Sequence, residues 1–204
     1  MYKKNLMIKK RKICFLTLVK SNSLRLKNKN LYPFKGKPLI YWTIKKIKKI
    51  SNNYFINTDS AEVIKIAKKN NVRIIKRSKK LLGDNIPARN IIKDSIKYMP
   101  KDTYGVITIQ ANSPNLNPEK LVKAMQVLQN TNIEDIYTLT SDGKVNGSFW
   151  AVTKKKIKKY NFSKNIHDHH AMQNEMWMID DAIDIHFIDD LKKAEKIFST
   201  KKLY

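Results

Sequence analysis

A run of basic and small polar residues follows the first apolar stretch of this 204-residue chain. Between residues 20 and 29 it offers cationic side chains and small hydrogen-bond donors, among them Lys20, Asn22, Ser23, Arg25 and Lys29. A triphosphate requires both charge compensation and donors that approach it closely. The run lacks the glycine spacing of a Walker loop or a dinucleotide fingerprint. We therefore expect phosphate binding of another kind, and the alternative is a solvated basic loop.

Apolar runs and helical patterns alternate along the chain, which indicates an α/β fold. We expect strands at 13–19, 54–56, 72–75, 104–110, 136–140, 147–152 and 182–187. We expect helices from Pro38 onward, at 61–69 with Ser60 as its cap, and at 89–99, 119–129 and 189–198, whereas 154–179 has no clear pattern. Ligands of open α/β sheets bind outside the carboxyl ends of the strands. The loops at Lys20, Asn57, Gln110 and Asp184 should therefore converge.

The length of the chain predicts a single domain over residues 13–204, preceded by a basic lead-in at 1–12. Cys14, the one cysteine, lies in the apolar run 13–19, so we expect a buried thiol and a reducing compartment, the cytoplasm. The same run is too short to cross a bilayer and short for a signal-peptide core. We expect no membrane partner.

The formal charge of +25 would normally point to nucleic acid or another polyanion. Only five of the 42 basic residues are arginine, however, and the lysines are spread over nearly every expected helix. Proteins that read bases rely on the bidentate fork of arginine. The charge therefore favours compositional bias over a specific nucleic-acid surface, with salt-sensitive, nonspecific binding of polyanions as a consequence.

The segment 18–44 resembles the N-terminal signature of the acylneuraminate cytidylyltransferases, also called CMP-sialic acid synthetases. The matching residues are Ser23, Lys29, Asn30, Leu31, Gly36, Lys37, Pro38, Leu39, Ile40, Thr43 and Ile44. Further family-like blocks follow in the same order, at Asn57, Thr58, Asp59 and Ser60, at Gln110, Ser113 and Pro114, at Asn146 and Gly147, and at 183–195. The resemblance covers most of the chain.

The resemblance implies a three-layer α/β/α fold with a Rossmann-like, mostly parallel sheet of the nucleotide-diphospho-sugar transferase type. It also implies the transfer of CMP from CTP to an acidic sugar, an N-acylneuraminate or a related nonulosonic acid, with release of pyrophosphate and with Mg²⁺ or Mn²⁺ as cofactor. The alternative is a non-catalytic nucleotide-binding relative that has lost its sugar and metal sites.

The resemblance assigns roles to individual residues as well. Lys20, in the place of a family arginine, Lys29 and Asp184 would be catalytic. Nucleotide binding would fall to Asn22, Ser23, Arg25, Lys29 and Asp84, and sugar binding to Gln110 and Ser113. The metal would be held by Asp184 and His186.

Two departures from the family pattern bear on these assignments. His186 stands where the family has a second aspartate, although Mg²⁺ prefers oxygen ligands.

Asp189 and Asp190 match the family block at the start of the last helix, where capping of the helix is the stronger interpretation. Between 136–140 and Asn146 the chain has only a short turn in place of the usual insert, so a homodimer is possible without the usual contact. The cluster at 167–170 is a weaker metal candidate.

Overall fold

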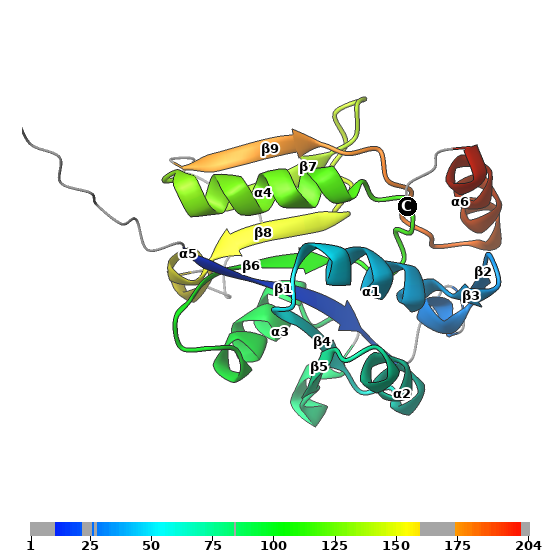
Figure 1. Cartoon of the computed structure of the whole chain (residues 1–204), viewed down its shortest axis with the longest axis horizontal. Coiled ribbons are helices and arrows are strands. Elements are labelled where there is room, and N and C mark those ends of the chain that lie inside the picture. Colours follow the sequence, from blue (N-terminus) through cyan, green and yellow to red (C-terminus); the bar gives the residue numbers. More distant parts are fainter. Residues whose placement is uncertain (1–10, 22–25, 27, 84, 160–173, 201–204) are drawn as a thin grey trace, which may run out of the picture.

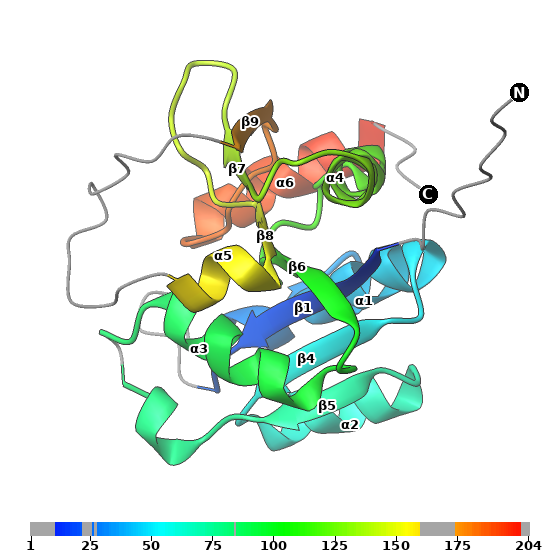
Figure 2. The same ribbon diagram turned by 90° about the vertical axis from the view of Figure 1, so that its left-hand side faces the viewer.

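The computed structural model describes residues 11–21, 26, 28–83, 85–159 and 174–200 and is drawn in Figures 1 and 2. The strands are β1 (Lys12–Val19), β2 (Pro33–Phe34), β3 (Lys37–Pro38), β4 (Tyr54–Thr58), β5 (Arg73–Lys76), β6 (Thr103–Ile109), β7 (Asp135–Leu139), β8 (Phe149–Thr153) and β9 (Glu175–Ile179). The α-helices are α1 (Leu39–Ile50), α2 (Ala61–Lys69), α3 (Ala88–Ser95), α4 (Pro118–Asn130), α5 (Lys154–Lys159) and α6 (Ile188–Thr200). The 3₁₀ helices are η1 (Lys29–Leu31), η2 (Lys79–Leu81) and η3 (Ile96–Tyr98). Over the described residues, no helix has the length and apolar character needed to cross a membrane.

One seven-stranded sheet has the order β5-β4-β1-β6-β8-β7-β9. Only β8 runs antiparallel to its neighbours β6 and β7, and the remaining pairings in this sheet are parallel. From β1 the chain moves outward to β4 and β5 and then returns to β6 on the other side of β1. The sheet therefore reverses its order between β1 and β6, which is where open α/β sheets bind ligands.

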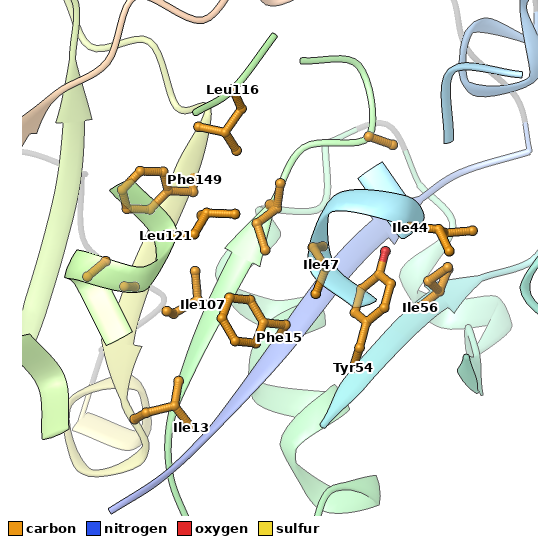
Figure 3. Close-up of a cluster of buried hydrophobic side chains, with 14 of the residues drawn as sticks. Ile13, Phe15, Ile44, Ile47, Tyr54, Ile56, Ile107, Leu116, Leu121 and Phe149 are labelled. Carbon is orange, nitrogen blue, oxygen red and sulfur yellow. The ribbon is translucent and has the colours of Figure 1, made fainter. Parts of the chain in front are cut away.

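Helices cover both faces of this sheet, so the predicted three-layer α/β/α architecture with a mostly parallel sheet is confirmed (Figure 1). On one face, α1, α2 and α4 pack over a core that includes Phe15, Ile107 and Leu121, which Figure 3 shows in close-up. On the other face, α3 and α5 pack over a second core around Leu16 and Val152. β1 contributes to both cores because its side chains alternate between the two faces.

A small hairpin precedes α1 and is closed by the two-residue turn Lys35-Gly36, in which both residues have positive φ. Such a turn suits the twist of a hairpin, and glycine adopts it without steric cost. The hairpin places Phe34 in a third cluster, where its ring meets Phe198 of α6 edge to face at 5.1 Å. The Gly-Lys-Pro block thus leads directly into α1, at Pro38 as predicted.

The expected strand at 182–187 was wrong. Residues 181–186 are irregular because their backbone bonds to the loop after β6 rather than to a strand: Ile183 N donates to Asn115 Oδ1 at 3.0 Å and Ile185 N to Asn112 O at 3.0 Å. The region without a clear pattern contains α5 and β9 instead. The strands predicted from residue 13 to 152 are present, with ends shifted by a few residues, and Ser60 caps α2.

The core of the first face yields a stability prediction. Phe15→Ala should lower the free energy of unfolding by about 3–5 kcal/mol, because it leaves a cavity beneath α1 and α4 at a fully buried position. Tyr98→Ala, at a side chain that is 62% exposed, should change it by less than about 0.5 kcal/mol. Urea denaturation, monitored by circular dichroism, measures both changes in the free energy of unfolding. Equal losses in the two variants would contradict the assigned core.

Candidate functional site

Two neighbouring strands end at the point where the sheet order reverses. β1 is followed by Lys20 and β6 by Gln110, and the strands pair in register as far as Thr17 opposite Ile109. Both residues are half-buried. The structure therefore brings the predicted basic loop and the predicted sugar-side loop to one edge of the sheet.

The end of β1 is tied to the end of β4 through Ser21 and Asp59. Ser21 N donates to Asp59 Oδ1 at 2.9 Å, and the Ser21 hydroxyl donates to the other carboxylate oxygen. Burial alone would raise the pKa of Asp59, but the two bonds from Ser21, helped by the nearby charge of Arg77, hold that pKa below its usual value. Asp59 is thus a negative charge that fixes the start of the basic loop.

Asn57, in the strand whose following loop was predicted to reach the site, has a buried side chain that joins neighbouring elements. Its Oδ1 accepts from Arg77 Nε at 2.8 Å, its Nδ2 donates to Ser95 Oγ at 2.9 Å, and its carbonyl accepts from Arg77 Nη2 at 3.1 Å. These bonds satisfy a fully buried amide, which would otherwise be costly. They join β4, the segment after β5 and α3 behind the site.

The loop after β6 is buried from Ala111 to Leu116 although it has no regular secondary structure. Buried backbone must find hydrogen-bond partners. Two side chains of α1 supply them: Thr43 Oγ1 donates to Ala111 O at 3.4 Å, and Lys46 Nζ donates to Pro114 O at 3.1 Å and to Leu116 O. This loop is therefore held in place by α1.

The same loop fixes the predicted metal ligand. Asn112 Nδ2 donates to Asp184 Oδ1 and, at 2.9 Å, to Ile185 O. The second carboxylate oxygen of Asp184 lies 2.8 Å from His186 Nε2. His186 thus faces the carboxylate with one of its two ring nitrogens, either of which could ligate a metal. Asn112, Asp184 and His186 form one connected chain of polar groups.

Asp190 lies in the first turn of α6 and caps that helix with its side chain. Its Oδ2 accepts from the backbone N–H groups of His186 at 3.0 Å and Phe187 at 2.9 Å, just before α6 begins. Burial alone would raise the pKa of Asp190, but these two bonds hold that pKa below its usual value. The capping interpretation of this aspartate is confirmed by these contacts.

Two buried charged side chains, Asp180 and Lys46, lie behind the loop after β6. Asp180, almost fully buried, accepts from Ser148 Oγ at 2.6 Å and lies 3.4 Å from Lys120 Nζ. Lys46 is also almost fully buried, and burial lowers its pKa to about 7, against an opposing pull from the charge of Asp180. The loop after β6 therefore packs against buried surroundings of low dielectric constant that contain few charged groups.

The remaining predicted site residues fall into two groups. Lys29 lies half-buried in η1, and Ser113 is buried, with a hydroxyl that has no hydrogen-bond partner among the described residues. Outside the described residues lie Asn22, Ser23, Arg25, Asp84 and the cluster 167–170. The roles assigned to all of them stay predictions.

Three residues that matter here were not predicted, namely Lys46, Asn112 and Asp180. Lys46 lies on the same helical stripe as Thr43 and Ile47, so its burial was readable from the spacing of the apolar positions in α1. Asn112 lies between Gln110 and Ser113, the two residues that were predicted to bind the sugar. No sequence pattern distinguishes Asp180 from the neighbouring acidic residues, because its burial depends on contacts with Lys120 of α4 and with Ser148, which are distant in the sequence.

The donor set at Asp184 fits a magnesium ion held largely by substrate. Over the part of the chain that the structure describes, no group of three or more His, Cys, Asp or Glu residues is arranged to hold a metal. Mg²⁺ commonly takes one or two protein carboxylates, several waters and phosphate oxygens of the substrate. One carboxylate at Asp184, oriented by Asn112, is consistent with that mode and not with an all-protein cage.

The family profile described as Cytidylyltransferase matches residues 15–198 of this chain. The chain is 26% identical over 133 residues to N-acylneuraminate cytidylyltransferase A of Danio rerio, which is 64% of this chain and 31% of that protein. It is 26% identical over 112 residues to 3-deoxy-manno-octulosonate cytidylyltransferase of Wigglesworthia glossinidia brevipalpis, which is 54% of this chain and 45% of that protein. The matches thus span less than half the length of these relatives.

Among solved structures, a cytidylyltransferase from Leptospira borgpetersenii superposes with a TM-score of 0.72. The superposition covers 93% of this chain and 87% of that chain at 15% identity, a level that shows the fold alone. The sheet order and layers described above are therefore those of a known nucleotidyltransferase fold, as the sequence predicted.

The turn before β8 yields a prediction about Gln110. Gly147 has φ +61°, and a Cβ there would lie 3.2 Å from Gln110 Nε2, whereas Gly143 has φ +82° and open space around it. Left-handed backbone should cost each alanine variant about 1–2 kcal/mol of unfolding free energy. Gly147→Ala should cost more than Gly143→Ala, because Gln110 must also move. Urea denaturation compares the two, and an equal cost would show that Gln110 does not fill this space.

Proposed function

This chain belongs to the cytidylyltransferase family, and on that premise we propose that it transfers CMP from CTP to the hydroxyl of an acidic sugar and releases pyrophosphate. One observation carries the proposal. At the point where the sheet order reverses, the basic strand end at Lys20 and the strand end that leads to the Asn112–Asp184 pair lie side by side. A basic edge suits a triphosphate, and an oriented carboxylate suits its metal ion.

The names of the two relatives support an acidic acceptor. One is named for N-acylneuraminate and the other for 3-deoxy-manno-octulosonate, and both of these sugars carry a carboxylate. Sialic, legionaminic, pseudaminic and eight-carbon ulosonic acids share that group with an anomeric hydroxyl. We propose this class as the acceptor rather than any single member of it.

In the proposed reaction the acceptor hydroxyl loses its proton to solvent and its oxygen forms a bond to the α-phosphorus of CTP. The bond from that phosphorus to the oxygen shared with the β-phosphorus breaks, and pyrophosphate leaves. Lys20 and Lys29 offset the negative charge of the triphosphate, and Ser21, held by Asp59, fixes the start of the loop that binds it. Asp184 would hold Mg²⁺ or Mn²⁺, and such an ion neutralises charge on the phosphates and the departing pyrophosphate. Gln110 and Ser113 lie on the acceptor side. Rate enhancement would come mainly from alignment and electrostatics.

The second candidate is a nucleotide-binding relative without turnover. It is favoured by the contacts of Asp184, whose two oxygens already accept from Asn112 and face His186. A metal ion must compete with the imidazole for that second oxygen. In this alternative the chain binds CTP but releases no pyrophosphate.

A pyrophosphate-release assay separates the two functions. The protein is incubated with each of the four nucleoside triphosphates, with Mg²⁺ or Mn²⁺, and with a panel of nonulosonic acids. We expect release with CTP and at least one acidic sugar. Measurable CTP binding in calorimetry without release under any combination would support the non-catalytic alternative and contradict ours.

Asp184→Asn provides the matched test of the metal ligand. It preserves the shape of the side chain but removes its charge, so kcat should fall by roughly 10²–10³-fold while CTP still binds. Asp189→Asn, at an exposed aspartate in the first turn of α6, should leave kcat within about twofold. Unchanged turnover in Asp184→Asn would rule out this residue as the metal ligand.

A further inference from the structure

The buried amine of Lys46 has two contacts that fix a loop of the site. It projects from α1, whose other inward residues at this level are Thr43, Ile44 and Ile47. Its Nζ donates to the carbonyls of Pro114 and Leu116. Leu116 itself is fully buried in the core of the first face (Figure 3). The amine therefore joins the helix to the far end of the loop after β6.

The number of acceptors around Lys46 matches an uncharged amine. An ammonium group has three N–H donors and an uncharged amine has two. Among the described residues the side chain bonds to two carbonyls and to no other acceptor. In the charged form one N–H would be buried without a partner, whereas in the uncharged form both N–H groups are satisfied.

The charges that face Lys46 do not compensate an ammonium group. Asp180 is the acidic group that acts on it, and no ion pair joins the two side chains among the described residues. Asp180 is already engaged by Ser148, from the turn before β8, and by Lys120 from α4. Burial consequently lowers the pKa of Lys46 to about 7, so the uncharged form is well populated at neutral pH.

The loop that Lys46 holds carries the acceptor side of the site. Asn112 orients Asp184, and Ser113 is a predicted acceptor contact. The Ser113 hydroxyl is buried without a partner among the described residues, so closing the loop has a desolvation cost. We propose that Lys46 is a positioning residue for acceptor binding: as an uncharged amine it ties Pro114 and Leu116 to α1, and its protonation favours opening of this loop. The assignment of an acceptor rests on the proposed function, whereas the control of the loop does not.

The direction of the pH dependence follows from linkage. In the closed loop the pKa of Lys46 is about 7, and in an open loop that exposes the side chain it returns towards 10.5. The open state therefore binds more protons between these two values, and the closed state is favoured as pH rises. The population of the open loop should fall by up to about tenfold per pH unit above pH 7. Below pH 6 it should be nearly constant.

Hydrogen exchange measured by mass spectrometry tests this without any substrate. The backbone amides of residues 111–113 and 115–117 are followed from pH 5.5 to 9, with correction for the intrinsic pH dependence of exchange; Pro114 has no amide hydrogen. In the unmodified protein their protection should rise above pH 7 by up to about tenfold per unit. In Lys46→Met it should be independent of pH. Lys45→Met, an exposed lysine on the same helix, should behave as the unmodified protein does.

A second variant covers the case in which Lys46→Met does not fold. Lys46→Gln keeps an uncharged group with two N–H donors, so its loop protection should be independent of pH. The same rise with pH in either folded variant would overturn the proposal, and so would a pH-independent loop in the unmodified protein. His186 is retained in both variants, so the difference isolates Lys46.

Steady-state kinetics then connects the loop to the site. With an acidic sugar that turns over, the KM for the sugar should fall as pH rises from 6 to 8, while the KM for CTP changes by less than about twofold. In Lys46→Gln the KM for the sugar should no longer fall as pH rises. Failure to find any acceptor sugar would count against the proposed function only, because the exchange measurement is decided without it.

Discussion

Buried backbone that belongs to neither helix nor strand must still satisfy its polar groups, and this constraint governs the site. From Ala111 to Leu116 the chain is buried and irregular, and its carbonyls are satisfied by Thr43 and Lys46 of α1 and by the backbone of Ile185. α1 is therefore both a layer of the core and the support of a functional loop. Any shift of that helix would be transmitted to the loop through these hydrogen bonds.

The two sides of the site are held in different ways. On the proposed nucleotide side, Asp59 holds Ser21 through bonds to a partly exposed carboxylate. On the proposed acceptor side, Asn112 and Lys46 act within buried surroundings where a polar group is costly unless it is paired. Small changes in polar contacts should therefore have larger effects around Asn112 and Lys46 than around Ser21.

Local patterns were sufficient for most of the fold. Strand β6 was recognisable as a buried apolar run, α2 by its cap at Ser60, and the three-layer architecture with a mostly parallel sheet by resemblance to a known family. The strand predicted at 182–187 was wrong because an alternating apolar pattern does not distinguish backbone that bonds to a neighbouring strand from backbone that bonds to asparagine side chains. β9 escaped notice because its two faces carry similar residues, with Met178 inward and Ile179 outward. Likewise, the pairing of His186 with Asp184 depends on backbone geometry that their sequence separation does not fix.

The aromatic contact between the hairpin and α6 has a consequence for biosynthesis. Phe34 is fully buried because Trp42 and Phe198 enclose it, together with Leu191 and Ala194 of the same late helix. A chain that emerges from the ribosome with its amino end first would expose this ring until α6 has been made. The hairpin at 33–38 therefore reaches its final packing only after α6 has been made, although it precedes that helix in the sequence.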